Sequence, residues 1–172
     1  MADSLKPTSL TDEHYRAFGR IIQAFVSVET LYAHIILRVF KIPDDTGSFV
    51  MSAYGYDDLR NFIKTMVAEW GASDEDKKAC GDLIDGLKAK AKLRNYVAHN
   101  PWKPGHRAGS IKPIVIKTRG RLVILGTEQN EKDWTAEELH TEATDILQRG
   151  IAVAAFFQDR GVDLSNPEQG KN

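Results

Sequence analysis

The sequence predicts an all-α fold, namely an antiparallel bundle of four to five helices with a small β-hairpin inserted before the last long helix. Three observations predict it. Apolar residues recur every three to four positions in four stretches of the chain. A proline or glycine closes each stretch, which leaves short connections. Two short alternating runs separate the third helical stretch from the last and are typical of a hairpin.

Length and composition predict a single helical domain over residues 1–172, with frayed tails at about 1–10 and 166–172. The chain is 42% apolar and 27% charged, which is ordinary for a globular protein. Cys80 is the single cysteine, so no disulfide framework is possible, and we expect it to pack in the core. We find no signal-peptide run and no segment near the roughly 20 apolar residues of a membrane span. We therefore expect a cytoplasmic protein without membrane contact.

The first long helix is expected to begin after the cap residue Thr11 and to end before Pro43. Glu29 lies within its apolar stripe. A carboxylate in an apolar seam is costly unless it is paired, and a guanidinium is the most suitable partner. We predict that Glu29 pairs with Arg94 and orients it without taking part in catalysis. In the alternative, Glu29 faces a solvated edge of the helix. The stripe consists of Phe18, Ile22, Phe25, Tyr32, Ile36 and Val39, and it is widened by Ile21, Val28, Leu31 and Ile35.

Two further helices are expected after this one. Asp44 to Gly55 is rich in turn-forming residues and predicts a loop. A shorter helix over residues 57–70 should end at Gly71. Ser73 caps the next helix, whose apolar series continues to Arg94, so this arginine is expected to point inward.

A hairpin and a last helix complete the prediction. Ile111–Lys117 and Arg121–Gly126 should form the hairpin, which either contacts a phosphate or only covers the bundle. Thr135 and Glu138 have the spacing of a capping box and open the last helix.

Charge is unevenly distributed, although the net charge is only -1. Between Asp85 and Glu128 the chain has no acidic residue and ten basic ones. A run of this kind is either a solvated face or a site for an anionic ligand. We predict that four residues of this region contact the substrate, although Trp102 could equally anchor the core. These residues are Lys90, Trp102, Lys103 and Arg107.

Arg94 and His99 carry the chemistry of this basic region. Arg94 stands five positions before His99, near the point where Pro101 should end the helix. A guanidinium can hold a phosphate with two parallel hydrogen bonds, while an imidazole can exchange a proton near neutral pH. The pairing therefore suits phosphate chemistry. The histidines lack the helical spacing of a zinc site, so we expect neither a metal nor another cofactor.

Arg94, Asn95 and His99 resemble the R-N-x-x-x-H motif of the HEPN superfamily, helical domains that include metal-independent ribonucleases of toxin and phage-defence systems. The long first helix and the motif's place near the end of a later helix also resemble that family. The resemblance implies a homodimeric endoribonuclease with RNA as substrate and with Arg94, His99 and Asn95 as catalytic residues. A protein antitoxin is a further implied partner. Pro101 stands where HEPN toxins paired with nucleotidyltransferase antitoxins carry tyrosine, which argues against that partnership.

The spacing of Arg94 and His99 sets a geometric condition. An ideal helix places them about 140° apart, so they can meet on one phosphate through a distorted last turn or across two subunits.

Two other functions stay open. One is a non-catalytic HEPN-like subunit that binds a nucleotide, RNA or a partner, with Arg94 and Glu29 as a structural ion pair. The other is a helical interaction protein, which would need the apolar stripe of the first helix to be exposed.

Overall fold

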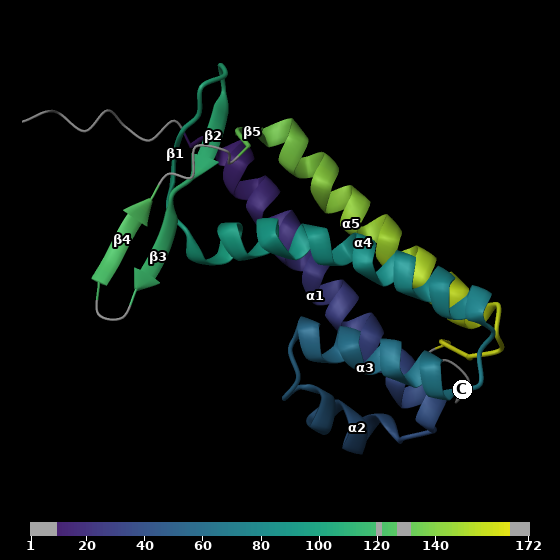
Figure 1. Ribbon diagram of the computed structural model, residues 1–172. Helices are drawn as coiled ribbons and strands as arrows, with labels where there is room; N and C mark the ends of the chain where they lie inside the picture. The colour runs from purple at the N-terminus through teal and green to yellow at the C-terminus, as the bar shows by residue number, and fades with distance from the viewer. Residues whose placement is uncertain (1–9, 120–121, 127–131, 166–172) are drawn as a thin grey trace, which may run out of the picture. The chain divides into compact units, whose positions relative to one another are not determined.

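The computed structural model, shown in Figure 1, describes residues 10–119, 122–126 and 132–165. These ranges contain five helices and five short strands, and the strands all lie between the last two helices. The predicted fold class is confirmed, since a helical chain carries a β-hairpin before its last long helix. The helices are α1 (Asp12–Phe40), α2 (Asp44–Met51), α3 (Tyr56–Glu69), α4 (Asp74–His99) and α5 (Ala136–Gln158).

The chain groups into two compact units. Unit 1 comprises residues 1–24 and 89–145, and unit 2 comprises residues 25–88 and 146–172. The boundaries cut α1, α4 and α5, so each of these helices contributes one part to each unit. No linker composition marks such a division, and the single domain expected from the sequence stays a prediction.

Unit 2 consists of helices around an aromatic and aliphatic core. Tyr56 of α3 packs against Phe25 and Tyr32 of α1, with ring centroids 5.5 and 5.9 Å away. Trp70 stacks on Phe157 of α5 at 6.3 Å. Cys80 is buried, and burial raises the pKa of its thiol to about 11, which confirms its packing role. Further residues without exposed surface are Ile35, Ile36, Ile63, Ile84 and Leu87.

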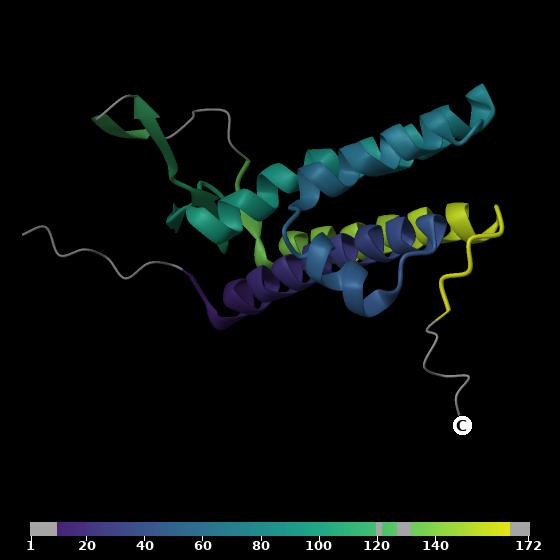
Figure 2. The ribbon, with the colours of Figure 1, turned by 90° about the horizontal axis from the view of Figure 1, so that it is seen from below.

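The expected loop over Asp44–Gly55 is wrong for its first part, where α2 forms. The amide of Gly47 donates to the carbonyl of Pro43 at 2.8 Å and closes the first turn. Asp44 and Asp45 lie in that turn, where the helix dipole favours negative charge. A Cβ atom at Gly47 would clash with Leu37, so glycine permits the close approach of α2 to the end of α1 (Figures 1 and 2).

Unit 1 contains all five strands. Strands β1 (Trp102–Pro104), β2 (Ser110–Pro113) and β5 (Trp134–Thr135) form an antiparallel sheet in the order β1-β2-β5. Strands β3 (Val115–Arg119) and β4 (Leu122–Gly126) form the hairpin. The expected strand Ile111–Lys117 is therefore two strands that separate at Ile114. The three-stranded sheet was not predicted from the sequence, because β1 and β5 are too short to show alternation.

Helix α1 buries most of its apolar stripe. By length and composition alone it could cross a membrane, which corrects the expectation that no segment approaches a span. The core helix of a globular protein has the same length and composition. The exposed stripe required for the interaction-protein alternative is not present, because its centre is at most 1% exposed at Ile21, Phe25, Val28, Tyr32, Ile35 and Ile36.

Candidate functional site

The candidate site lies at the C-terminal end of α4, in unit 1. The helix continues to His99, because residues 89–98 include alanines and leucine that favour a helix and Pro101 then stops it. The side-chain amide of Asn100 donates to the carbonyl of Ile114 at 2.8 Å. In return the amide of Ile114 donates to the carbonyl of Pro101 at 2.8 Å. These two hydrogen bonds fix the helix end to the chain before β3, a role for Asn100 that the sequence did not suggest.

Arg94, Asn95 and His99 lie on the last two turns of this helix. Arg94 is half-buried, whereas Asn95 and His99 are exposed, and the expected inward direction of Arg94 stays a prediction. Nη1 of Arg94 donates to Oδ1 of Asn95 at 3.0 Å. The amide of Asn100 still donates to the carbonyl of Tyr96 at 3.0 Å, so the last turn is regular. Of the two expected routes to convergence, the distorted turn is not observed, and Arg94 and His99 keep the angle of about 140° of an ideal helix.

Glu29, the predicted support of Arg94, lies on α1 within unit 2. It is half-buried and lines a cavity of about 630 Å³ together with His34 and Asp44. Nε of Arg38 donates to His34 at 3.3 Å, and Nη2 of Arg38 donates to Asp44 at 3.0 Å. Arg94 belongs to unit 1, so its pairing with Glu29 stays a prediction.

Lys90 and Arg107, two of the four expected substrate contacts, form ion pairs inside unit 1. Nζ of Lys90 lies 2.5 Å from Glu142 and 2.8 Å from Asp145. Arg107 binds both carboxylate oxygens of Glu138, at 3.1 and 2.7 Å. The same carboxylate accepts from the amide of Thr135, which confirms the predicted capping box of α5. Both cations thus form ion pairs within the protein. Their role as substrate contacts stays a prediction.

Trp102 and Lys103 differ in their surroundings. Trp102 is 7% exposed and packs on Phe18 at a centroid distance of 4.8 Å, which supports the core-anchor alternative over stacking on a base. Lys103 is half-buried and lies directly opposite Lys112 of β2 in the antiparallel register. Like charges at such a position repel each other. Lys112 is only 5% exposed, so Lys103 is the more accessible of the two to an anion.

A small basic and aromatic cavity on unit 1 was missed by the sequence analysis. It measures about 230 Å³, and its lining includes Lys92, Tyr96, Lys132 and Trp134. The ammonium of Lys92 lies 5.3 Å from the ring centre of Tyr96, and that of Lys132 lies 3.9 Å from Trp134. Aromatic rings beside cations are the groups that bind bases and phosphates of single-stranded nucleic acid. The signal was hidden because α4 supplies one half of the cavity and the chain around β5 the other.

Within the described parts of the chain, no three His, Cys, Asp or Glu residues are placed to hold a metal ion. No family model matches the chain, and neither a curated protein nor a solved structure matches it.

Proposed function

We propose that this chain is a HEPN-like, metal-independent endoribonuclease that works as a homodimer in the cytoplasm, in a toxin-antitoxin or phage-defence system. The end of α4 carries the proposal. It holds a half-buried arginine, bonded to Asn95, on the same two turns as an exposed histidine. A fixed guanidinium and an accessible imidazole are the two groups that metal-free cleavage of RNA requires.

The regular last turn supports the proposed dimer. In one copy Arg94 and His99 point about 140° apart on an ideal helix and cannot hold one phosphate together. Two copies of α4 that face each other would place Arg94 of one copy beside His99 of the other. The activity should therefore be lost in a monomer.

The reaction would be a transesterification in which the RNA supplies its own nucleophile. His99 takes the proton of the ribose 2'-hydroxyl, and the 2'-oxygen forms a bond to phosphorus. The bond from phosphorus to the 5'-oxygen breaks, and His99 returns the proton to that leaving oxygen. Arg94 stabilises the negative charge of the phosphorane, and Asn95 keeps the guanidinium aimed through their hydrogen bond. DNA lacks the 2'-hydroxyl and should not be cleaved.

RNA would be held by the cations and rings around this site. Lys103 offers a charge for a phosphate, and the 230 Å³ cavity beside Tyr96 and Trp134 offers rings for an unstacked base. The contacts of Lys90, Arg107 and Trp102 within unit 1 favour a second candidate function, a non-catalytic HEPN-like subunit that binds RNA or a partner. These contacts leave fewer groups for a scissile strand.

The decisive test is cleavage of a mixed-sequence RNA by the purified chain in EDTA. Arg94→Ala and His99→Ala should each reduce the rate on the order of a hundredfold or more. The matched control is His106→Ala, which removes another exposed histidine of the same unit. Products from the wild type should end in 2',3'-cyclic phosphate.

Mixing the two inactive variants distinguishes a composite site from a site within one copy. A heterodimer of Arg94→Ala with His99→Ala contains one intact Arg/His pair if the pair crosses the dimer, so activity should return in part. If the mixture stays inactive while wild type cleaves, the composite site is wrong. Binding of RNA without cleavage by wild type would favour the non-catalytic subunit.

A further inference from the structure

Exposed aromatic side chains gather on unit 2, far along the sequence from the Arg/His motif. Phe40 is 53% exposed, Tyr54 49% and Phe62 44%, while Phe49 on α2 is 83% exposed. Large apolar groups at the surface cost solvation free energy and mark interaction sites when they are contiguous. Phe40, Tyr54 and Phe62 are contiguous in this sense, because they line one cavity.

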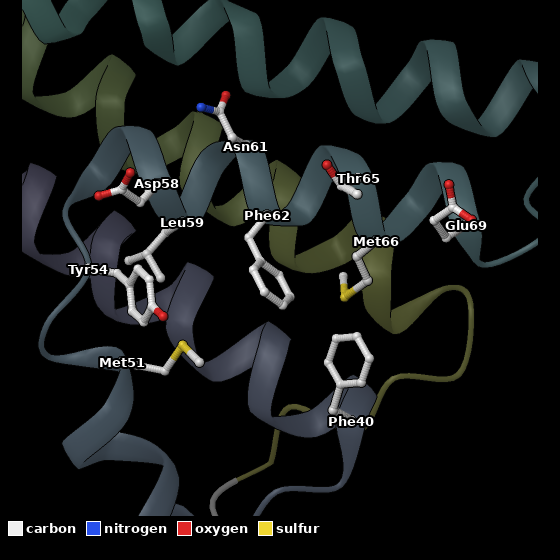
Figure 3. Close-up of a pocket in the computed structure, with 10 residues that line it drawn as sticks. All are labelled: Phe40, Met51, Tyr54, Asp58, Leu59, Asn61, Phe62, Thr65, Met66 and Glu69. Atoms are coloured by element: carbon white, nitrogen blue, oxygen red, sulfur yellow. The ribbon is translucent and has the colours of Figure 1, made fainter.

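This cavity is a groove of about 460 Å³ that runs along α3. Phe62 and Met66 of α3 point into it from one side, and Phe40 and Met51 point into it from the other (Figure 3). The rings of Phe40 and Phe62 meet edge to face at 5.9 Å. Methionine side chains adapt their shape to different apolar partners, so the floor of the groove can accommodate more than one kind of side chain.

The charges of the groove are of one sign. Its lining includes Asp58 and Glu69, and the lining residues include no lysine, arginine or histidine. The two carboxylates lie at opposite ends of the row of apolar residues (Figure 3). They are eleven positions apart on the helix, which corresponds to roughly 16 Å. A small amine could reach one of these carboxylates but not both, whereas a helix of about three turns could reach both.

We propose that this groove binds an amphipathic helix of a partner protein, with apolar side chains on one face and a lysine or arginine near each end of the contact. The apolar face would lie along the row formed by Phe40, Phe62 and Met66 at helical spacing, as helix-in-groove complexes do. The basic residues would pair with Asp58 and Glu69. This surface is separate from the proposed ribonuclease site, and its test does not depend on RNA cleavage.

The first measurement uses the full chain and two designed peptides of about 18 residues, labelled for fluorescence anisotropy. Both peptides carry leucines at i, i+3, i+4 and i+7. One carries lysine on the remaining positions and the other carries glutamate. The lysine peptide should bind and the glutamate peptide should not, and the affinity for the lysine peptide should fall as salt is added.

Variants on both sides of the groove assign the binding to this place. Phe62→Ala and Phe40→Ala should each reduce the affinity for the lysine peptide by about tenfold or more. The matched control is Phe49→Ala, since Phe49 is more exposed than either and does not line the groove. Circular dichroism confirms that each variant keeps its helices. Because all three rings are largely exposed, their loss should leave the fold intact.

A charge variant tests the second element of the proposal. Asp58→Asn combined with Glu69→Gln should remove the preference for lysine over glutamate. The control is Glu137→Gln combined with Asp159→Asn, which neutralises two exposed carboxylates outside the groove and should preserve the preference.

The remaining outcomes overturn the proposal. Failure of the lysine peptide to bind, equal binding of both peptides, or equal binding to Phe62→Ala and the wild type would each exclude a basic helix at this groove. If Phe62→Ala instead converts a dimer into a monomer in light scattering, the occupant is a second copy of this chain and not a separate partner.

Discussion

Unit 1 and unit 2 both combine an apolar core with ion pairs, but they differ in which cations form those pairs. In unit 2 aromatic and aliphatic side chains of four helices pack on one another, with Phe157, Ile63 and Leu87 fully buried. In unit 1 ion pairs join α5 to the rest of the unit, from Lys90 to Glu142 and from Arg107 to Glu138. Ion pairs also join segments of unit 2, from Lys64 to Asp85 and from Arg160 to Asp76. What differs is that the paired cations Lys90 and Arg107 of unit 1 belong to the basic run, whereas Lys64 and Arg160 of unit 2 lie outside it.

This difference changes what the basic run means for function. Ten basic residues between Asp85 and Glu128 suggested a surface for an anion. Within unit 1, however, Lys90 and Arg107 already neutralise carboxylates. The number of cations in a run therefore does not give the number of ligand contacts. A lysine or arginine that already pairs with a carboxylate of the same protein is a weaker candidate for a ligand contact.

The largest effect should come from the core of unit 2. Phe157→Ala removes a ring with no exposed surface that stacks on Trp70. The free energy of unfolding should fall by about 3–5 kcal/mol, because apolar contacts are lost and a cavity is left. Urea denaturation followed by circular dichroism measures this change. Phe49→Ala, at an 83% exposed position, should change it by less than about 0.5 kcal/mol, and similar losses for both variants would contradict the packing of unit 2.

The long helices were easier to predict from the sequence than the short elements, for a physical reason. Helical periodicity is repeated over many turns, so α1, α3, α4 and α5 could be located from their apolar positions and caps. Helix α2 was missed because Asp44 to Gly55 is rich in turn-forming residues, whereas the close approach of Gly47 to Leu37 depends on tertiary packing. Strands β1 and β5 contain three and two residues and hold no local signal of that kind.

The candidate site was predictable in its chemistry and not in its surroundings. Arg94 and His99 could be found from residue types and spacing, and the regular helix end then excluded a distorted turn. The ion pairs of Lys90 and Arg107 could not be found, because their partners lie on α5, 52 and 31 residues away. Contacts between distant segments have no signature in a single sequence without an alignment.

An intermediate effect should follow when an ion pair of unit 1 is broken. Lys90→Ala leaves Glu142 and Asp145 close together without their shared cation. We expect a loss of about 1–2 kcal/mol in the free energy of unfolding, because these side chains are between 20% and 33% exposed and water offsets part of the lost pairing. Thermal and urea unfolding measure the change. Lys88→Ala removes an exposed lysine two residues earlier and should have little effect.

Lys90→Ala and Lys88→Ala also distinguish a structural role of Lys90 from a role in RNA binding. If Lys90 contacts RNA, Lys90→Ala should weaken RNA binding more than Lys88→Ala does, after both are corrected for the folded fraction. If its role is structural, the two variants should bind RNA equally and differ in stability alone. Filter binding at two salt concentrations separates these outcomes.

The smallest effect should appear at Arg107 and should depend on pH. The hydrogen bonds from Arg107 hold the pKa of Glu138 at about 2, below its usual value of 4.5. The stabilisation from ionised Glu138 is therefore complete above pH 4.5 and is lost as the pH falls toward 2. Arg107→Gln should raise the pKa of Glu138, so the variant should melt at a lower temperature than wild type near neutral pH.

The difference between Arg107→Gln and wild type should shrink as the pH falls from 4.5 to 2, because protonated Glu138 no longer needs a cation. Melting temperatures at a series of pH values would show this convergence. Lys103→Gln, which removes another cation of the same run, should show no such convergence. A constant difference across the whole range would mean that Arg107 stabilises unit 1 through its hydrogen bond to the carbonyl of Asp133 and not through its charge.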